Sequence, residues 1–400
     1  MTPFAYPQYR RLWTSSVLSW SSQWIQQAAM GWVVYEVTGS GALLGAVLGV
    51  RAVPMILLAP LSGVAADRFN RKRLLQASQL LAGAVSAGLG AALAFGRVDV
   101  WMLFVFVVLM GASNVIDRPA RFTSAFELVP REIAAKAMAL NTIGFSLMRV
   151  LGPALAGYLI AAAGAAGTFL VLALLYGASA LVALTVAIPP PRQPKARTSA
   201  LADMAEGFRF SVRDPVMRML LALGALPYLL LVPVWVTLFP IYAKDVFAAG
   251  PEGLGVLLTS VGLGGTLGGL IANALARAER QGLLQAAWIA AMATAILGVA
   301  ASPTLPVAAV CAFFGGVAEM ALTASNMAVL QLSAPEAMRG RIASLMLLYP
   351  AMISTGSFLA GPLADLLGAR GAAAVLAAAA LVTLALLYFS SPVIKEIRQR

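Results

Sequence analysis

Long apolar segments joined by short polar loops run through the whole chain. Twelve of these segments are long enough to cross the roughly 30 Å hydrocarbon layer of a bilayer as helices. They cover 12–35, 42–66, 74–94, 101–118, 137–163, 166–188, 217–242, 252–276, 283–301, 306–331, 343–367 and 371–390. The pattern predicts an all-α polytopic membrane protein with twelve transmembrane helices.

One long polar connection interrupts this pattern and divides the chain into two halves. It spans 189–215, begins as a proline-rich linker and continues into Leu201–Arg213, which favours a short amphipathic helix at the cytoplasmic surface. We expect an N-terminal six-helix bundle over 1–188, a C-terminal six-helix bundle over 216–390 and a cytoplasmic tail over 391–400.

The two halves carry a weak internal repeat. A shift of 209 residues places Arg68 on Arg277, Arg71 on Arg280 and the run 74–77 on the identical run 283–286. Two pseudo-symmetric six-helix bundles are the architecture of transporters that bind their substrate near the membrane midplane. Asp67 falls on Ala276, so the second half lacks the corresponding acid.

Composition points to lipid surroundings and away from enzymes. Apolar residues make up 60% of the chain and charged residues 11%, whereas a soluble protein has about 25% charged residues. The chain has no histidine and one cysteine, Cys311, which excludes histidine-based catalysis, Cys/His zinc sites and an internal disulfide. We therefore expect no metal, no cofactor and no enzymatic activity.

The basic residues predict the orientation in the membrane. The net charge of +12 arises in loops between apolar segments, which argues against a nucleic-acid partner. With both termini in the cytoplasm, 23 of the 28 lysines and arginines lie inside, three lie outside and two lie within segments, as the positive-inside rule requires. Arg10 and Arg11 precede the first segment without a cleavage pattern, so this helix should be retained.

A dense charge cluster fills 63–75, between the second and third segments. It resembles the loop that major facilitator superfamily transporters carry at this place, Gly-x-x-x-Asp-Arg-x-Gly-Arg-Arg/Lys. The matching residues are Gly63, Asp67, Arg68, Arg71 and Lys72. Asn70 replaces the second glycine of the pattern, a mild departure because asparagine tolerates left-handed backbone better than most residues.

The resemblance implies that this loop is part of a gate. Asp67 would meet the start of the eleventh segment, where the positive end of a helix favours a carboxylate. Arg68 or Arg71 would pair with an acid at the inner end of the fourth segment, where Asp117 lies. The alternatives are a topogenic anchor for the loop, and proton carriage in place of structural pairing for Asp117.

The fifth segment contains a second family element, formed by Gly152, Pro153 and Gly157. It resembles the Gly-Pro-x-x-Gly-Gly element of facilitator exporters, with Ala156 and Met148 in place of two expected glycines. Glycine and proline in a span allow a neighbouring helix to approach closely. The resemblance favours export and a gating role, and ordinary packing of small residues is the alternative.

Three ionisable residues lie deep within predicted spans, namely Arg51, Arg149 and Glu319. Each costs about 2.5–3.5 kcal/mol at a helix centre, so each needs a partner or a wet cavity. Thr323 and Asn326 share a helix face with Glu319. Glu319 is the candidate proton carrier, and a fixed ion pair with Arg51 or Arg149 is the alternative. Two arginines against one glutamate favour an anionic or polyphenolic substrate.

The first segment carries a wide polar stripe. Its members are Ser15, Ser16, Ser19, Ser22, Gln23, Gln26 and Gln27. A stripe of this width does not face lipid. We expect most of it to line water or substrate, and hydrogen bonds to neighbouring helices to account for the rest.

Two further runs, 30–39 and 118–137, resemble the superfamily branch that contains enterobactin exporters and macrolide-efflux proteins of the drug:proton antiporter type. The resemblance implies a monomer in the bacterial inner membrane that exports a small amphiphilic or siderophore-like molecule against protons by alternating access. A proton-coupled importer and a lipid-handling transporter of the same fold stay open. A non-transporting sensor or scaffold is disfavoured, because it would need an added soluble domain.

Overall fold

Every regular element in the described part of the chain is a helix, as the sequence predicts. The computed structural model describes residues 2–58, 70–188, 200–346 and 348–397. The chain forms two compact units, and the following paragraphs treat each by itself. The first unit comprises Met1–Thr38 and Val50–Arg197, and the second comprises Gly39–Gly49 and Thr198–Arg400.

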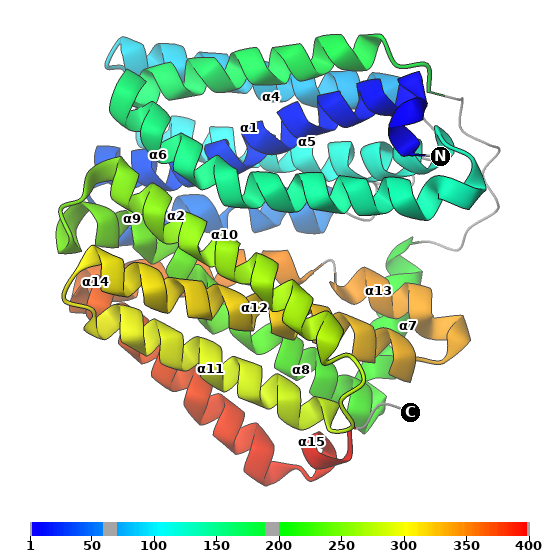
Figure 1. The fold of residues 1–400 in the computed structure, drawn as a ribbon. Coiled ribbons are helices and arrows are strands. Elements are labelled where there is room, and N and C mark those ends of the chain that lie inside the picture. Colours follow the sequence, from blue (N-terminus) through cyan, green and yellow to red (C-terminus); the bar gives the residue numbers. More distant parts are fainter. Residues whose placement is uncertain (1, 59–69, 189–199, 347, 398–400) are drawn as a thin grey trace. The chain divides into compact units, whose positions relative to one another are not determined.

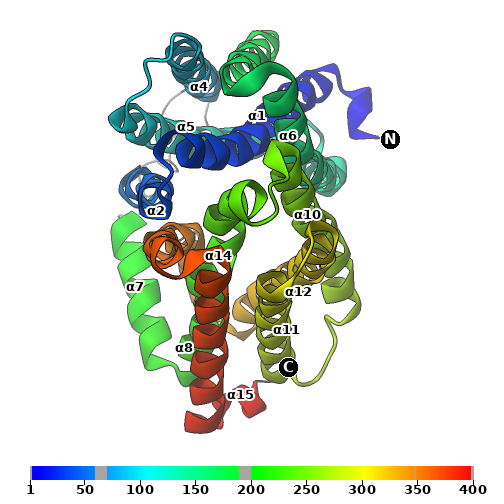
Figure 2. The same cartoon turned by 90° about the vertical axis from the view of Figure 1, so that its left-hand side faces the viewer.

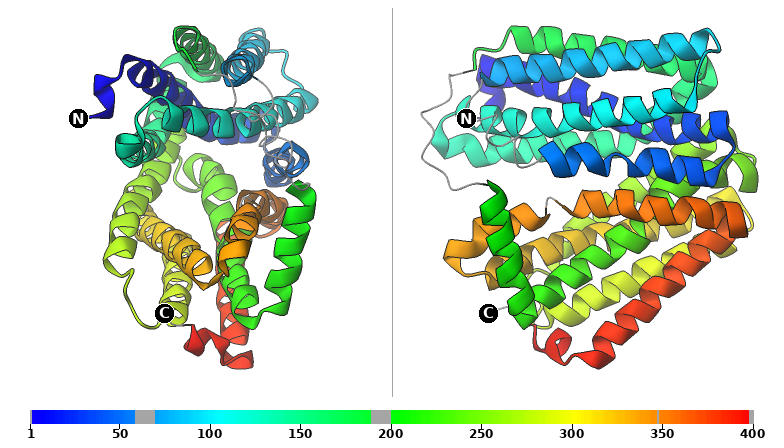
Figure 3. Two further views of the ribbon diagram at one scale, coloured as in Figure 1. Left: turned by 90° about the vertical axis from the view of Figure 1, so that its right-hand side faces the viewer. Right: turned by 180° about the vertical axis from the view of Figure 1, so that it is seen from behind.

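Four long helices lie in the described part of the first unit (Figure 1). They are α1 (Pro7–Thr38), α4 (Arg71–Ala94), α5 (Val100–Glu127) and α6 (Arg131–Leu184), preceded by the 3-10 turn η1 (Pro3–Ala5). α6 packs against α1 and α4, and Figure 3 shows α4 beside the later part of α6. Buried apolar side chains of all four helices, among them Tyr9, Leu75 and Ala125, form a core cluster.

The second unit is also entirely helical in its described part. Its elements are α2 (Gly41–Gly49), α7 (Ala200–Arg213), α8 (Pro215–Leu230), η2 (Val234–Leu238), α9 (Phe239–Ile241), η3 (Tyr242–Val246), α10 (Gly250–Ala274), α11 (Gln281–Ala301), α12 (Leu305–Ser333), η4 (Glu336–Met338), α13 (Arg339–Met346), α14 (Tyr349–Ser390) and α15 (Val393–Glu396). α12 packs against α10 and α11, and α2 packs against α14, as Figure 2 shows. α7 coincides with the amphipathic helix predicted at Leu201–Arg213.

Nine helices in the described residues are long and apolar enough to cross a membrane. Two of these, α6 with 54 residues and α14 with 42, are each long enough to cross twice. They are interrupted at Gly164 and Gly368, which both have a φ of 70°, a conformation that glycine adopts without steric cost. α1 has 32 residues, but its serines and glutamines make it less apolar. A total of twelve crossings stays a prediction.

Asn70, which stands where the family pattern has glycine, begins α4 as a helix cap and does not adopt a left-handed backbone. Its φ is −61°, and its side chain accepts hydrogen bonds from the amides of Lys72 and Arg73 at 3.0 and 3.4 Å. Asparagine is favoured at this position because its oxygen satisfies amides that have no partner within the helix. The departure from the family pattern therefore has a local structural function.

Missing side chains allow α10 and α12 to lie in close contact. A Cβ at Gly264 would collide with the carbonyl oxygen of Phe313, and one at Gly316 would collide with that of Val261. Glycines on both partners therefore permit backbone-to-backbone packing, the usual way in which transmembrane helices associate.

Replacing Gly264 with alanine should destabilise the second unit, because the added methyl group can be accommodated only if α10 and α12 separate. We expect a loss of about 1–3 kcal/mol, as for other overpacked cores. Gly88 on α4 has open space at the Cβ position, so Gly88→Ala is the matched control. Thermal unfolding in detergent measures both variants, and equal midpoints would contradict the packing argument.

Candidate functional site

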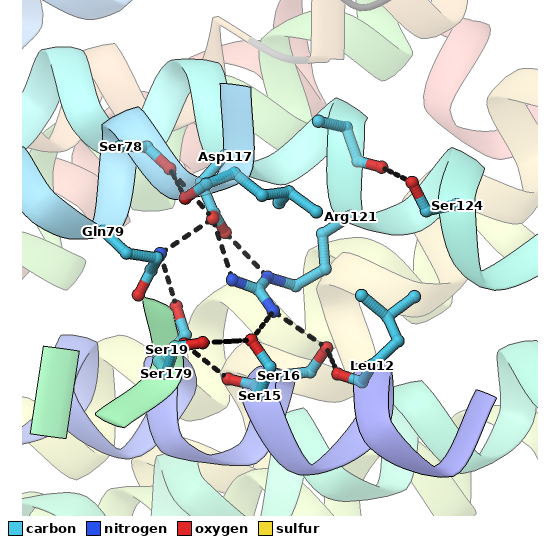
Figure 4. Close-up of polar contacts among 12 residues, drawn as sticks. Leu12, Ser15, Ser16, Ser19, Ser78, Gln79, Asp117, Arg121, Ser124 and Ser179 are labelled. Carbon is cyan, nitrogen blue, oxygen red and sulfur yellow. Dashed lines mark hydrogen bonds and ion pairs between the residues drawn. The ribbon is translucent and has the colours of Figure 1, made fainter. Parts of the chain in front are cut away.

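A buried ion pair on α5 is the centre of the polar cluster in the first unit (Figure 4). Arg121 Nε donates to Asp117 Oδ2 and Arg121 Nη2 donates to Asp117 Oδ1, both at 2.9 Å. The two residues are 1% and 5% exposed. A buried pair is stable only if further hydrogen bonds satisfy its remaining donors and acceptors.

Polar side chains of α4 supply the further donors to the carboxylate. Gln79 Nε2 donates to Asp117 Oδ1 at 2.8 Å, and the Ser78 hydroxyl donates to the same oxygen at 3.2 Å. Gln79 Nε2 also donates to the hydroxyl oxygen of Ser19 on α1, at 3.2 Å. The carboxylate of Asp117 is therefore bound from two helices.

Serines of α1 supply the acceptors for the guanidinium. Arg121 Nη1 donates to Ser16 Oγ at 3.1 Å and to Ser15 Oγ at 3.3 Å. The Ser15 hydroxyl lies 3.0 Å from the carbonyl oxygen of Ser179 on α6 and donates to it. Ser15, Ser16 and Ser19 are buried, so this part of the stripe joins helices, and the cavity role of Ser19 stays a prediction. Short hydroxyl side chains can satisfy an interior guanidinium where larger groups would not fit.

The other members of the stripe have different surroundings. Ser22 donates to the backbone carbonyl of Leu18 at 2.8 Å. Gln26 is 6% exposed, and Gln27 accepts a hydrogen bond from Arg51 at 3.4 Å. Gln23 is half-buried. The cavity roles of Gln23 and Gln26 stay predictions.

Arg71 pairs with Glu127, which corrects one of the two expected partners of Asp117. Arg71 is the first residue of α4 and Glu127 is the last residue of α5. Glu127 was not considered as a partner because α5 continues past the predicted end of the fourth segment. The other expected partner of Asp117, Arg68, lies outside the described residues.

Asn326 is the centre of a second polar cluster, in the second unit. Its Nδ2 donates to the carbonyl oxygen of Leu220 on α8 at 2.8 Å and to Gln285 Oε1 on α11 at 2.9 Å. The Tyr349 hydroxyl donates to its Oδ1 at 3.4 Å. Asn326 is 1% exposed. Through these three hydrogen bonds its amide links α12 to α8, α11 and α14.

Glu319 and Thr323 lie on the same helix as Asn326 but are less enclosed. Both side chains are half-buried. The Thr323 hydroxyl lies 3.1 Å from that of Tyr228 and donates to the carbonyl oxygen of Glu319 at 2.7 Å. Tyr228 stacks on Tyr349 with 5.3 Å between ring centroids. The three residues share one helix, but only Glu319 and Thr323 are partly accessible.

Gly152 brings α6 close to α1, because a Cβ at this position would collide with Trp24. Pro153 and Gly157 are buried on the same helix. Gly152 therefore has the packing role that was the alternative to gating, and a gating role for Gly152, Pro153 and Gly157 stays a prediction. Arg149 on α6 is half-buried, and its role in binding or coupling also stays a prediction.

An acid of α14 caps the start of α2. Asp365 accepts hydrogen bonds from the amides of Gly41 and Ala42, at 2.6 and 2.9 Å, and from the Ser40 hydroxyl at 2.9 Å. Ser40 in turn accepts from the amide of Leu43 at 3.2 Å. Free amides and the positive helix end make this position favourable for a carboxylate.

Below this cap, small residues hold α2 and α14 in direct contact. A Cβ at Gly45 would collide with the carbonyl oxygen of Ser357, and one at Gly361 would collide with that of Gly41. Residue numbers rise along α2 as they fall along α14, so the two helices are antiparallel. We call this contact, from Ser40 and Asp365 to Gly45 and Ser357, the α2–α14 seam.

Three predicted gate residues, Gly63, Asp67 and Arg68, lie outside the described residues. Arg121 and Asp365, by contrast, had no predicted role. The i, i+4 spacing of Asp117 and Arg121 was a usable signal, but Arg121 was counted as a loop residue. In the part of the chain that the structure describes, no group of three or more His, Cys, Asp or Glu could hold a metal ion.

Comparison with known proteins gives whole-chain matches. A family model described as transmembrane secretion effector matches residues 1–399. The chain is 30% identical over 353 residues to the multidrug efflux pump Tap of Mycolicibacterium fortuitum, with 85% of both chains covered. It is 27% identical over 376 residues to the enterobactin exporter EntS of Shigella boydii, covering 92% of this chain and 86% of the relative. The staphyloferrin A transporter of Staphylococcus aureus is 23% identical over 365 residues, with 89% of each covered.

Solved structures confirm the fold class. A bacterial homologue of the human lysosomal transporter Spinster, inward-facing and occupied, matches with a TM-score of 0.79 at 13% identity, over 100% of this chain and 99% of that one. The nucleoside transporter NupG matches with a TM-score of 0.74 at 15% identity, over 96% and 98% of the two chains. At such low identity these likenesses establish the fold alone.

Removing the carboxylate of Asp117 should cost more stability than removing the whole pair. Asp117→Ala leaves Arg121 buried without a counter-charge, and we expect a loss of about 3–5 kcal/mol. The double variant Asp117→Leu/Arg121→Met replaces the pair with apolar groups and should recover most of this loss. Folded yield and thermal midpoint in detergent measure the difference. Wild-type stability of Asp117→Ala would contradict structural pairing and favour proton carriage.

Proposed function

Because the chain belongs to the transmembrane secretion effector family of major facilitator transporters, we propose that it exports a small amphiphilic molecule by alternating access, in exchange for protons. The family and the apolar helices make it a multi-pass protein of the bacterial inner membrane. Relatives named for multidrug efflux and enterobactin export support a drug-like or siderophore-like substrate. The excess of basic residues on one side supports cytoplasmic termini.

The α2–α14 seam is the observation that carries the alternating-access mechanism. Asp365 near the end of one helix binds the first turn of its antiparallel partner. We propose that Asp67, outside the described residues, does the same at the opposite end, where it would meet the start of the eleventh predicted segment. With the proposed topology, Asp365 closes the outer end of the seam and Asp67 the inner end, and the cycle exchanges one contact for the other.

The strength of this contact suits a gate. Asp365 is exposed, and a carboxylate at an exposed helix N-terminus contributes about 0.3–1 kcal/mol. Such a contact forms and breaks readily in each cycle. At Gly45 and Gly361 the two helices meet through backbone atoms, so fewer side chains have to move there before α2 leaves α14.

Glu319 is the proposed site of proton coupling. It is the one carboxylate near the middle of a predicted span, and its half-buried position on α12 supports access to a proton. Asp117, in contrast, is fully engaged by Arg121, Gln79 and Ser78. Protonating Asp117 would leave the buried Arg121 without its partner, which makes it the less suitable carrier.

Locking the seam should stop transport. In a Cys311→Ala background, Ser40→Cys and Asp365→Cys replace two side chains whose oxygens lie 2.9 Å apart, so oxidation should join them. We expect oxidised protein to lose export of candidate drugs or enterobactin from vesicles, and reducing agent to restore it. The single-cysteine variants, which cannot cross-link within one chain, are the controls. Undiminished export by the cross-linked protein would contradict opening at this seam.

Glu319→Gln should abolish export driven by a pH gradient, because the amide keeps the size of the side chain but cannot release a proton. Export should fall to the passive rate in proteoliposomes, while substrate binding stays measurable. Glu319→Asp, which keeps a carboxylate, is the matched control and should retain coupled export. Wild-type export by Glu319→Gln would place proton coupling at another residue.

A further inference from the structure

Two arginines of the first unit lack an acidic partner in the described part of the chain. Neither Arg51 nor Arg118 forms an ion pair with a described residue. Arg51 Nη1 donates only to Gln27 Oε1, at the long distance of 3.4 Å. Arg118 makes no hydrogen bond there, and its guanidinium lies 5.6 Å from the centre of the Phe145 ring. Both guanidinium groups therefore have N–H donors to spare.

The two cations lie along the same helix, α5. The charge of Arg118 repels that of Arg51. The aliphatic stem of Arg51 runs beside α5, where a Cβ at Gly111 would lie 3.8 Å from its Cγ. Asp117 attracts Arg118, but its two oxygens are bound by Arg121. Like charges kept together in a membrane protein favour a counter-charge that comes from outside the chain.

The neighbouring polar groups are donors as well. The indole N–H of Trp24 and the hydroxyl of Tyr176 are buried and have no hydrogen-bond partner. Trp24 packs against Phe145, the ring beside Arg118, with 5.6 Å between centroids, and Arg51 acts electrostatically on Tyr176. A group of donors with so few acceptors is complementary to an oxyanion, whose oxygens only accept.

Aromatic rings complete the surroundings of Arg118. Phe145 lies between Trp20, at 6.0 Å and nearly perpendicular, and Trp24. Trp20 and Trp24 are one turn apart on α1, so both rings reach the same side of the helix. Such rings pack against flat apolar groups, and they strengthen the hold on a ligand without fixing its exact shape.

We propose that Arg51 and Arg118 form an anion-binding subsite of the transporter, and that Trp24 and Phe145 contact the flat apolar body of the same ligand. The ligand class is an organic anion in which a carboxylate, phenolate or phosphate is joined to an aromatic or conjugated group. A cation of the same shape is rejected by the two guanidinium groups. This inference rests on the proposed function and names the substrate class of that exporter.

Three probes of nearly equal shape test the charge preference. Naphthoate is an anion, naphthamide is neutral and naphthylmethylammonium is a cation. Their binding to the purified full-length protein in detergent is measured by quenching of tryptophan fluorescence. We expect naphthoate to bind at least about ten-fold more tightly than the cation, as expected for hydrogen bonds to a charged group. Equal affinity for the three probes would overturn the proposal.

Variants then locate the subsite. Arg118→Gln should weaken naphthoate binding about ten-fold and leave naphthamide binding unchanged. This variant should fold, because the exposed Arg118 side chain makes no hydrogen bond in the described structure. Arg118→Lys should recover part of the affinity, since it keeps the charge but loses the planar fork. Arg97→Gln, at an exposed loop arginine, is the matched control and should bind as the wild type does. Unchanged naphthoate binding by Arg118→Gln would overturn the assignment to this arginine.

The phosphate of a lipid headgroup also has oxygens that accept hydrogen bonds from arginine. A further experiment therefore distinguishes an organic substrate from a lipid headgroup as the ligand. Displacement of naphthoate by phosphatidylglycerol, but not by phosphatidylcholine, would overturn the substrate assignment in favour of a lipid headgroup. Retained naphthoate binding in the presence of both lipids supports an organic substrate. If proteoliposomes export neutral or cationic drugs but the probes show no charge preference, the subsite fails and the export function stands. If naphthoate binds as expected but no compound is exported, the export function fails instead.

Discussion

The ion pair between Asp117 and Arg121 is the interaction on which the first unit depends. Two charges withdrawn from water are stable only when nearly every donor and acceptor is satisfied, and here the partners come from α1, α4 and α5. A shift of any of these helices would leave a buried charge with fewer hydrogen bonds. The pair therefore couples the helices, and Ser15 extends the coupling to α6 through Ser179.

In the second unit, a buried polar group also links several helices, but it carries no charge. The shift of 209 residues that reveals the repeat also places Asp117 on Asn326 and Arg121 on Leu330. Asn326 binds Gln285 of α11 and a carbonyl of α8, just as Asp117 binds Gln79 of α4 and, through Arg121, the serines of α1. An amide donates and accepts at once, so this cluster needs no counter-ion. The equivalent position links equivalent helices in both halves, by an ion pair in one and by an amide in the other.

The sequence was sufficient to predict the helical class, the family and the approximate spans, because these depend on hydrophobic length and on local charge patterns. The breaks at Gly164 and Gly368 fall between predicted segments for the same reason. Side-chain partners were less predictable. Glu127 was not considered as the partner of Arg71 because the predicted segment ended at residue 118, whereas α5 continues to Glu127. The last turns of α5 are polar, so hydropathy could not reveal that the helix continues. Asp365 was overlooked because its partners are backbone amides of a segment far away in the chain, which no local pattern reveals.

The contacts of the chain differ in strength according to what must move. Around the Asp117–Arg121 pair of the first unit, the charges and the serines of α1 share hydrogen bonds, so breaking one contact leaves several groups with fewer partners. At the α2–α14 seam, in contrast, the helices meet through backbone atoms at Gly45 and Gly361, and an exposed carboxylate supplies the cap. Water can replace that cap at little cost, since both the carboxylate and the helix amides become solvated when they separate. The proposed alternating-access cycle needs both kinds of contact, because helices can transmit a movement only if the contact that opens is weaker than the contacts that hold each bundle together. In this chain, the buried charges strengthen the contacts within the first unit, and the glycines and the exposed carboxylate keep the α2–α14 seam weaker.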